Sequence, residues 1–86
     1  MASYRVDLTR SAEKDLRRID RSQTVAIYNA LESLEQEPRP HGVKKLVGAD
    51  RTYRIRVGDY RIVYEIENDV LVVLVIRIAH RKDVYR

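Results

Sequence analysis

One stretch of the sequence, residues 52–64, restricts the possible folds of this 86-residue chain more than any other. Apolar and basic side chains alternate over residues 53–57, which is the pattern of a strand that is buried on one face. Gly58-Asp59 is a two-residue turn signal, because glycine adopts a positive φ without steric cost. The pattern therefore predicts a β-hairpin whose returning strand covers residues 60–66.

A two-residue turn also determines which residues of the two strands face each other. The predicted cross-strand pairs are Val57 with Tyr60, Arg56 with Arg61, Ile55 with Ile62, and Arg54 with Val63. Arg54, Arg56 and Arg61 then project from the same face of the sheet, and like charges at opposed positions repel each other. A bound anion would relieve that repulsion, whereas on a solvated face the long side chains would spread apart. The hairpin alone leaves both interpretations open.

Length and composition limit the class of protein. The chain has room for one domain, residues 1–86, with one modest core. It has no cysteine, and its two histidines are far apart in sequence, so we expect no metal site and no cofactor. No apolar run is long enough to cross a membrane, and the first residues do not resemble a signal peptide. We therefore expect a cytoplasmic protein with no membrane partner.

The distribution of charge points to an anionic partner. The net charge is +4, and the excess lies mostly in residues 51–86, which carry eight basic against five acidic residues. Most of the basic residues are arginines, whose planar guanidinium suits bidentate binding of anions. An acidic protein or a nucleic acid is the expected partner.

The part of the chain before the hairpin predicts one strand and two helices. The strand covers residues 4–8, where apolar and polar residues alternate. The first helix has Thr9 as its cap and ends near Ile19, and the second has Ser22 as its cap and ends near Glu37, just before a proline. The loop that follows contains a histidine, His41, and an exposed loop histidine is more often inert than catalytic.

The last strand is expected at residues 70–78, which are nearly all apolar, as in a strand that is covered on both faces. If it pairs with the returning strand of the hairpin through a two-residue turn at Asn68-Asp69, Arg61 lies opposite Ile76. The chain then leaves the sheet close to the arginines. We expect three side chains of this tail to reach the same face: His80, Arg81 and Tyr85.

The expected order of elements is strand, helix, helix and three strands (β-α-α-β-β-β). Two helices packed on one face of a mostly antiparallel, four-stranded sheet make an α+β fold of two layers. The opposite face would carry the arginines and the tail.

If that face cuts a phosphodiester, the chemistry that it offers requires RNA. Its guanidiniums can bind a phosphate, and its imidazole titrates near neutrality. The sequence has no acidic cluster that would hold Mg²⁺, so a phosphodiester would have to be cut without metal, with the 2′-OH of the RNA as nucleophile. Arginines would stabilise the charge that develops on the phosphate. DNA lacks the 2′-OH and would not be a substrate.

Three segments carry a resemblance to a known family: residues 53–57 (YRIRV), 58–64 (GDYRIVY) and 80–85 (HRKDVY). With them the whole chain resembles the RelE branch of the RelE/ParE superfamily, the toxins of type II toxin–antitoxin modules. The resemblance implies ribosome-dependent cleavage of mRNA in the A site, which inhibits translation. It also implies a cognate RelB-like antitoxin as partner and contact with operator DNA only through that antitoxin.

The resemblance further assigns roles to individual residues. Arg54 and Arg56 match two basic residues that handle protons and charge, and Arg61 matches the arginine that contacts the scissile phosphate. Arg81 matches the arginine that follows the last strand, and Tyr85 matches a tyrosine that stacks on a base and orients the 2′-OH. Further basic residues are expected to contact RNA: Lys44, Lys45, Arg51 and Lys82.

The chain departs from the family pattern at two places. Arginines stand at positions 54 and 56, where some members have lysine, and an arginine stays protonated and is a poor general base. His80 or Tyr85 therefore becomes the candidate base. The sequence also ends at Arg86 without the C-terminal helix that some members have, so inhibition by displacement of such a helix is not expected.

Two other functions remain possible from the sequence. A ParE-like protein of the same fold would bind and inhibit gyrase, although a protein-binding inhibitor does not need the basic and aromatic set. A catalytically weak member would act mainly in a DNA-binding complex with its antitoxin. Inhibition of supercoiling by gyrase would identify the first, and lack of toxicity without the antitoxin would identify the second.

Overall fold

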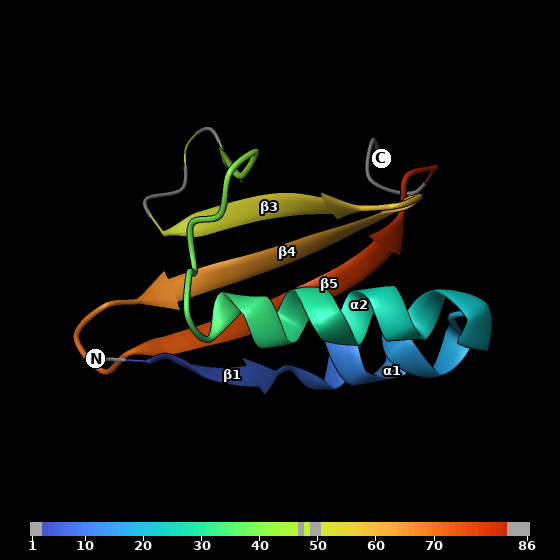
Figure 1. Cartoon of the computed structure of the whole chain (residues 1–86), viewed down its shortest axis with the longest axis horizontal. Helices are drawn as coiled ribbons and strands as arrows, with labels where there is room; N and C mark the ends of the chain where they lie inside the picture. Colours follow the sequence, from blue (N-terminus) through green and yellow to red (C-terminus); the bar gives the residue numbers. More distant parts are fainter. Residues whose placement is uncertain (1–2, 47, 49–50, 83–86) are drawn as a thin grey trace.

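The computed structural model describes residues 3–46, 48 and 51–82. Within these residues, two helices cover one face of a single sheet, and no helix covers the other face (Figure 1). The elements in chain order are β1 (Arg5–Leu8), α1 (Arg10–Arg18), α2 (Arg21–Leu34), β2 (Lys44–Lys45), β3 (Thr52–Val57), β4 (Tyr60–Glu67) and β5 (Val72–His80). This two-layer α+β arrangement confirms the predicted fold class.

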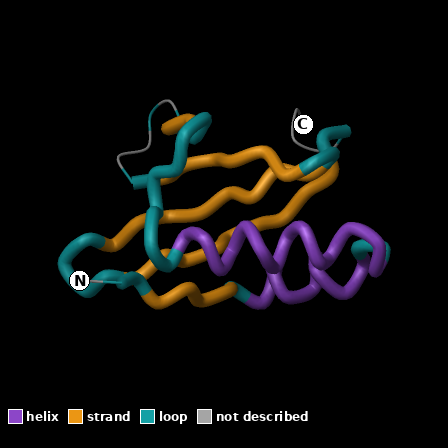
Figure 2. The backbone as a smooth tube through the Cα atoms, in the orientation of Figure 1, coloured by secondary structure: helices purple, strands orange, loops and turns teal. Residues whose placement is uncertain are grey.

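The sheet has five strands where four were predicted. Their order is β1-β5-β4-β3-β2, and β1 runs parallel to β5 while the other neighbours are antiparallel. The additional strand, β2, has only two residues, which is too short to show the alternation that reveals a strand in a sequence. The tube in Figure 2 shows it at the edge of the sheet beside β3.

Side chains of the residues before each helix cap its first turn. Thr9 Oγ1 accepts a hydrogen bond from the backbone N–H of Ala12 at 3.1 Å, as predicted. For α2 the predicted cap, Ser22, is wrong. Asp20 is the cap, and its Oδ1 accepts from the N–H of Ser22 at 3.2 Å. α2 also ends earlier than predicted, at Leu34, and a turn leads from there to Pro38.

The core lies between the helices and the sheet. The largest fully buried side chains come from α2, β4 and β5, namely Ile27, Leu34, Ile62, Tyr64, Ile66, Val73 and Val75. Because side chains of a strand alternate between the two faces, the residues of β4 that alternate with these buried positions point to the helix-free face. Arg61 is one of them. On β5, Leu74 and Ile76 are only half-buried, so the prediction that this strand is covered on both faces is wrong.

The hairpin register was predicted correctly, and that of β4 with β5 was not. Arg56 faces Arg61 across the β3–β4 hairpin, as expected, but Arg61 faces Ala79 of β5 instead of Ile76. The turn before β5 is longer than two residues and contains Leu71 at a φ of 54°. In addition, the pairing shifts by a bulge next to Val63.

Candidate functional site

A basic hollow lies on the sheet, where β2, β3 and β4 run side by side. It has a volume of about 270 Å³. We call it the arginine hollow, and its lining residues are Gly42, Lys44, Arg54, Ile55, Arg56 and Arg61. Of the described residues that line it, four are cationic and none is acidic, so the hollow suits an anion.

Strand pairing explains why these cations gather. The β3–β4 register sets Arg56 directly opposite Arg61, and the β2–β3 register sets Lys44 directly opposite Arg54. Directly opposed side chains of a sheet are on the same face, a few ångströms apart. The structure thus brings the three predicted arginines together and adds Lys44 to them.

Arg61 carries the clearest sign of a missing partner. Its Nη1 atom is buried and has no hydrogen-bond partner among the described residues. A buried donor without an acceptor is costly and rare in folded proteins. Arg56, by contrast, donates from Nε to the backbone oxygen of Gly58 at 3.1 Å. Arg61 also lines the arginine hollow, where its guanidinium would attract an anionic ligand.

Arg81 is held against the turn of the β3–β4 hairpin. Its backbone N–H donates to the carbonyl oxygen of Asp59 at 2.7 Å, and its Nε lies 3.9 Å from Asp59 Oδ1. Figure 1 shows that the end of β5 and this turn meet at one end of the sheet. Asp59, which the sequence suggested only as a turn residue, therefore also anchors Arg81. Tyr85 lies outside the described residues.

The expectation that His80 shares the face of the arginines is wrong. His80 faces Tyr60, and their rings meet edge to face with centroids 5.3 Å apart. Tyr60 packs against the core, and both rings line a hollow whose other wall is formed by α1, with Asp15 as one lining residue. The observed register differs from the predicted one by three residues, from Ile76 to Ala79. Because a shift by an odd number exchanges the two faces, His80 changes sides.

The other residues expected to contact RNA lie outside the arginine hollow. Lys45 faces Tyr53, which stacks on the buried ring of Tyr64 and so belongs to the helix-covered face. Arg51 forms an ion pair with Glu67, with 2.6 Å between Nη1 and Oε2. Lys82 is exposed and follows Arg81, at the end of the sheet where the hairpin turns. Of these residues and Lys44, the structure places only Lys44 in the hollow.

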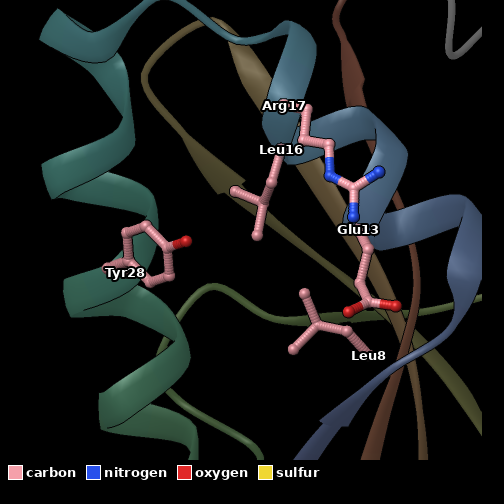
Figure 3. A pocket seen from close by; sticks show the side chains of 5 residues that line it. All are labelled: Leu8, Glu13, Leu16, Arg17 and Tyr28. Carbon is pink, nitrogen blue, oxygen red and sulfur yellow. The ribbon is translucent and has the colours of Figure 1, made fainter.

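A second hollow, of about 370 Å³, lies between the two helices and β1 (Figure 3). We call it the helix hollow, and its lining residues are Leu8, Glu13, Leu16, Arg17 and Tyr28. The ring of Tyr28 reaches from α2 toward Leu16 on α1, and the tyrosine is 57% exposed. An exposed aromatic residue beside half-buried leucines is typical of a contact surface for another protein. The sequence analysis did not single out this surface.

Comparison with known proteins agrees with this fold. Residues 6–85 match the family model described as the ParE toxin of the type II toxin–antitoxin system parDE. Toxin RelG of Mycobacterium tuberculosis is 32% identical over 87 residues, which cover 96% of this chain and 97% of RelG.

Solved structures of RelE proteins also superpose closely. For the RelE–RelB complex of Pyrococcus horikoshii the TM-score is 0.82 at 28% identity, covering 93% of this chain and 97% of the other. For the isolated RelE toxin of E. coli the TM-score is 0.80 at 28% identity, covering 95% of this chain and 90% of the other. In the described part of this chain no helix is long and apolar enough to cross a membrane. The chain belongs to the ParE toxin family and is a RelE-like toxin of a type II toxin–antitoxin module.

Proposed function

We propose that this toxin is an endoribonuclease that cleaves mRNA in the ribosomal A site and thereby inhibits translation in the cytoplasm. The observation that carries the proposal is that Arg61, whose buried Nη1 has no partner among the described residues, lines a hollow together with three other cationic residues. A phosphodiester supplies both the negative charge and the acceptor oxygens that such a site needs.

In the proposed reaction the scissile phosphate occupies the arginine hollow. The 2′-oxygen of the RNA attacks the phosphorus and the bond to the 5′-oxygen breaks. The leaving 5′-oxygen takes up a proton from water, so the products are a 2′,3′-cyclic phosphate and a 5′-hydroxyl. Arg54, Arg56 and Arg61 stabilise the charge on the phosphate oxygens, and Arg81 approaches from the hairpin turn. The nucleophile belongs to the substrate, so the scheme uses no metal ion.

The reaction also needs a group that accepts the proton of the 2′-OH. Guanidinium groups do not release a proton near neutral pH. Lys44 is the one charged side chain among the described residues lining the arginine hollow that is not a guanidinium, and an amine can act as a base once it is deprotonated. The proposal therefore assigns proton transfer to Lys44 rather than to His80. Tyr85 keeps its role as a stacking platform for a base, and Lys82 that of a contact to a flanking phosphate.

The proposal includes a RelB-like antitoxin as the inhibitor. The similar structure from Pyrococcus horikoshii is a complex of RelE with RelB. On this chain, Tyr28 and Leu16 of the helix hollow can make apolar contacts with the antitoxin. The cations of the arginine hollow would attract its acidic residues. Operator DNA is reached only through the antitoxin.

The direct test is to add the purified toxin to ribosomes that carry a defined mRNA and to map the 5′ ends of the fragments. Cuts inside the A-site codon, absent with mRNA alone, are the expected result. A toxin that leaves the mRNA intact but stops supercoiling by gyrase would instead be a ParE-like inhibitor. Intact mRNA and unaffected gyrase, without toxicity in cells, would indicate a protein that acts only in a complex with its antitoxin.

A further inference from the structure

We infer that His80 is a positioning residue that acts through Arg81. The ring of His80 stabilises the turn that contains Arg81. It does not take part in proton transfer. The link to catalysis depends on the proposed function, because Arg81 has a catalytic role only if the toxin cleaves RNA. The holding contact itself is a property of the free protein.

The first observation is a hydrogen bond within the tail. The backbone N–H of Lys82 donates to Nδ1 of His80 at 3.2 Å. A side-chain acceptor that binds the N–H two residues later closes a small turn, as aspartate and asparagine do in Asx turns. The contact requires an unprotonated Nδ1, so the neutral ring carries its proton on Nε2. Nδ1 is thereby occupied by a structural bond.

The second observation is that the ring of His80 packs against the ring of Tyr60. The edge-to-face contact with Tyr60 has an interplanar angle of 81°. His80 also lines a hollow together with Asp15 and Arg18 of α1, Ile19 at its end, and Arg77 of β5. A half-buried ring in such a setting has few rotamers open to it, so it can fix the backbone to which it bonds.

The third observation is that two hydrogen bonds hold the backbone at Arg81. Its own N–H bonds to the carbonyl oxygen of Asp59, and the next N–H bonds to His80. The side-chain ion pair of Arg81 with Asp59 is long, at 3.9 Å, and both side chains are more than half exposed. Such a pair contributes little to holding a conformation. The two backbone hydrogen bonds therefore fix the position of the backbone from which the side chain of Arg81 extends.

Two substitutions separate this role from others. In His80→Asn, Oδ1 is the same number of bonds from the backbone as Nδ1 and can accept the N–H of Lys82. In His80→Gln, the acceptor is one carbon further out and cannot close the same turn. Single-turnover cleavage on programmed ribosomes should stay near the wild-type rate in His80→Asn. It should fall about tenfold in His80→Gln, the factor that corresponds to one hydrogen bond, with unchanged affinity for the ribosome. Equal loss in both variants would overturn the inference.

A double-mutant cycle tests whether His80 acts through Arg81. In the Arg81→Ala background, His80→Gln should cause no further loss, because the group that it positions is already gone. A loss that multiplies with that of Arg81→Ala would show an independent role of His80, such as proton transfer, and would refute the positioning role.

Hydrogen exchange of the Lys82 amide in the free toxin tests the contact without any activity assay. Exchange should be slow in the wild type and in His80→Asn, and faster in His80→Gln. If exchange follows this pattern but the wild type does not cleave mRNA, the contact stands and the proposed function fails. If exchange is the same in all three proteins, the positioning role fails whatever the toxin cleaves.

Discussion

Lys44 is the residue at which charge and proton transfer can be separated by mutation. Lys44→Arg keeps the positive charge in the arginine hollow but replaces the amine, to which the proposal assigns proton transfer, by a guanidinium. We expect single-turnover cleavage to fall by about 100-fold or more, as for the loss of a general base, with little change in ribosome affinity. Lys45→Arg, on the same strand but on the other face, is the matched control and should cleave normally. Equal rates for the two variants would exclude Lys44 as the base.

At the residue scale, the sequence predicted the features that depend on pairing between strands adjacent in the chain. The cluster of three arginines follows from a hairpin with a two-residue turn, in which position alone determines the face. Two features depend instead on tertiary structure. Lys44 lies opposite Arg54 because β2 pairs with β3, and Arg61 Nη1 lacks a partner in the described part of the chain because of the way in which the surrounding side chains pack. No pattern in the sequence carries that information.

At the scale of elements, a hydrogen bond of Tyr64 connects the loop after α2 to the sheet. The Tyr64 side chain is fully buried on β4, and its hydroxyl donates to the carbonyl oxygen of Pro38 at 2.8 Å. We expect Tyr64→Phe to lower the free energy of unfolding by about 1 kcal/mol, because it removes this bond and leaves the carbonyl without a donor. Urea denaturation measures the change. Tyr53→Phe is the control, since the Tyr53 hydroxyl takes part in an exposed contact with Arg39, and it should cost much less.

The same tyrosine predicts a dependence of stability on pH. Burial raises the pKa of the Tyr64 phenol well above its ordinary value of 10.0. Above that value the unfolded chain loses the phenolic proton while the folded protein keeps it, so the free energy of unfolding falls as the pH rises. The fall between about pH 10 and 11 should be smaller in Tyr64→Phe than in the wild type. Parallel curves for the two proteins would show that Tyr64 does not contribute.

The elements themselves were largely predictable, and their long-range register was not. Helices and strands follow from hydrophobic periodicity, which is a local property. The pairing of β4 with β5 depends on a longer turn with Leu71 at positive φ and on a bulge, and a leucine gives no signal for that backbone. The resulting shift by three residues removed His80 from the predicted site. A register error of this kind changes the function assigned to a residue.

For the whole molecule, the two hollows predict that inhibition and catalysis can be separated. Tyr28→Ala should weaken antitoxin binding by about 2 kcal/mol or more if its ring is a central contact, and it should leave mRNA cleavage unchanged. Val70→Ala, which changes another exposed apolar residue between β4 and β5, should affect neither. Titration calorimetry with the antitoxin gives both affinities. Normal affinity of Tyr28→Ala would place the antitoxin elsewhere.

Cleavage of A-site mRNA by Arg61→Ala is the measurement that tests the central claim most directly. Loss of a charged donor at the developing charge should raise the barrier by about 3 kcal/mol, which lowers the single-turnover rate more than 100-fold. Arg51→Ala, which removes an exposed arginine outside the arginine hollow, should cleave at nearly the wild-type rate. A folded Arg61→Ala toxin that cuts mRNA as fast as the wild type would contradict the assignment of the arginine hollow as the site of phosphate cleavage.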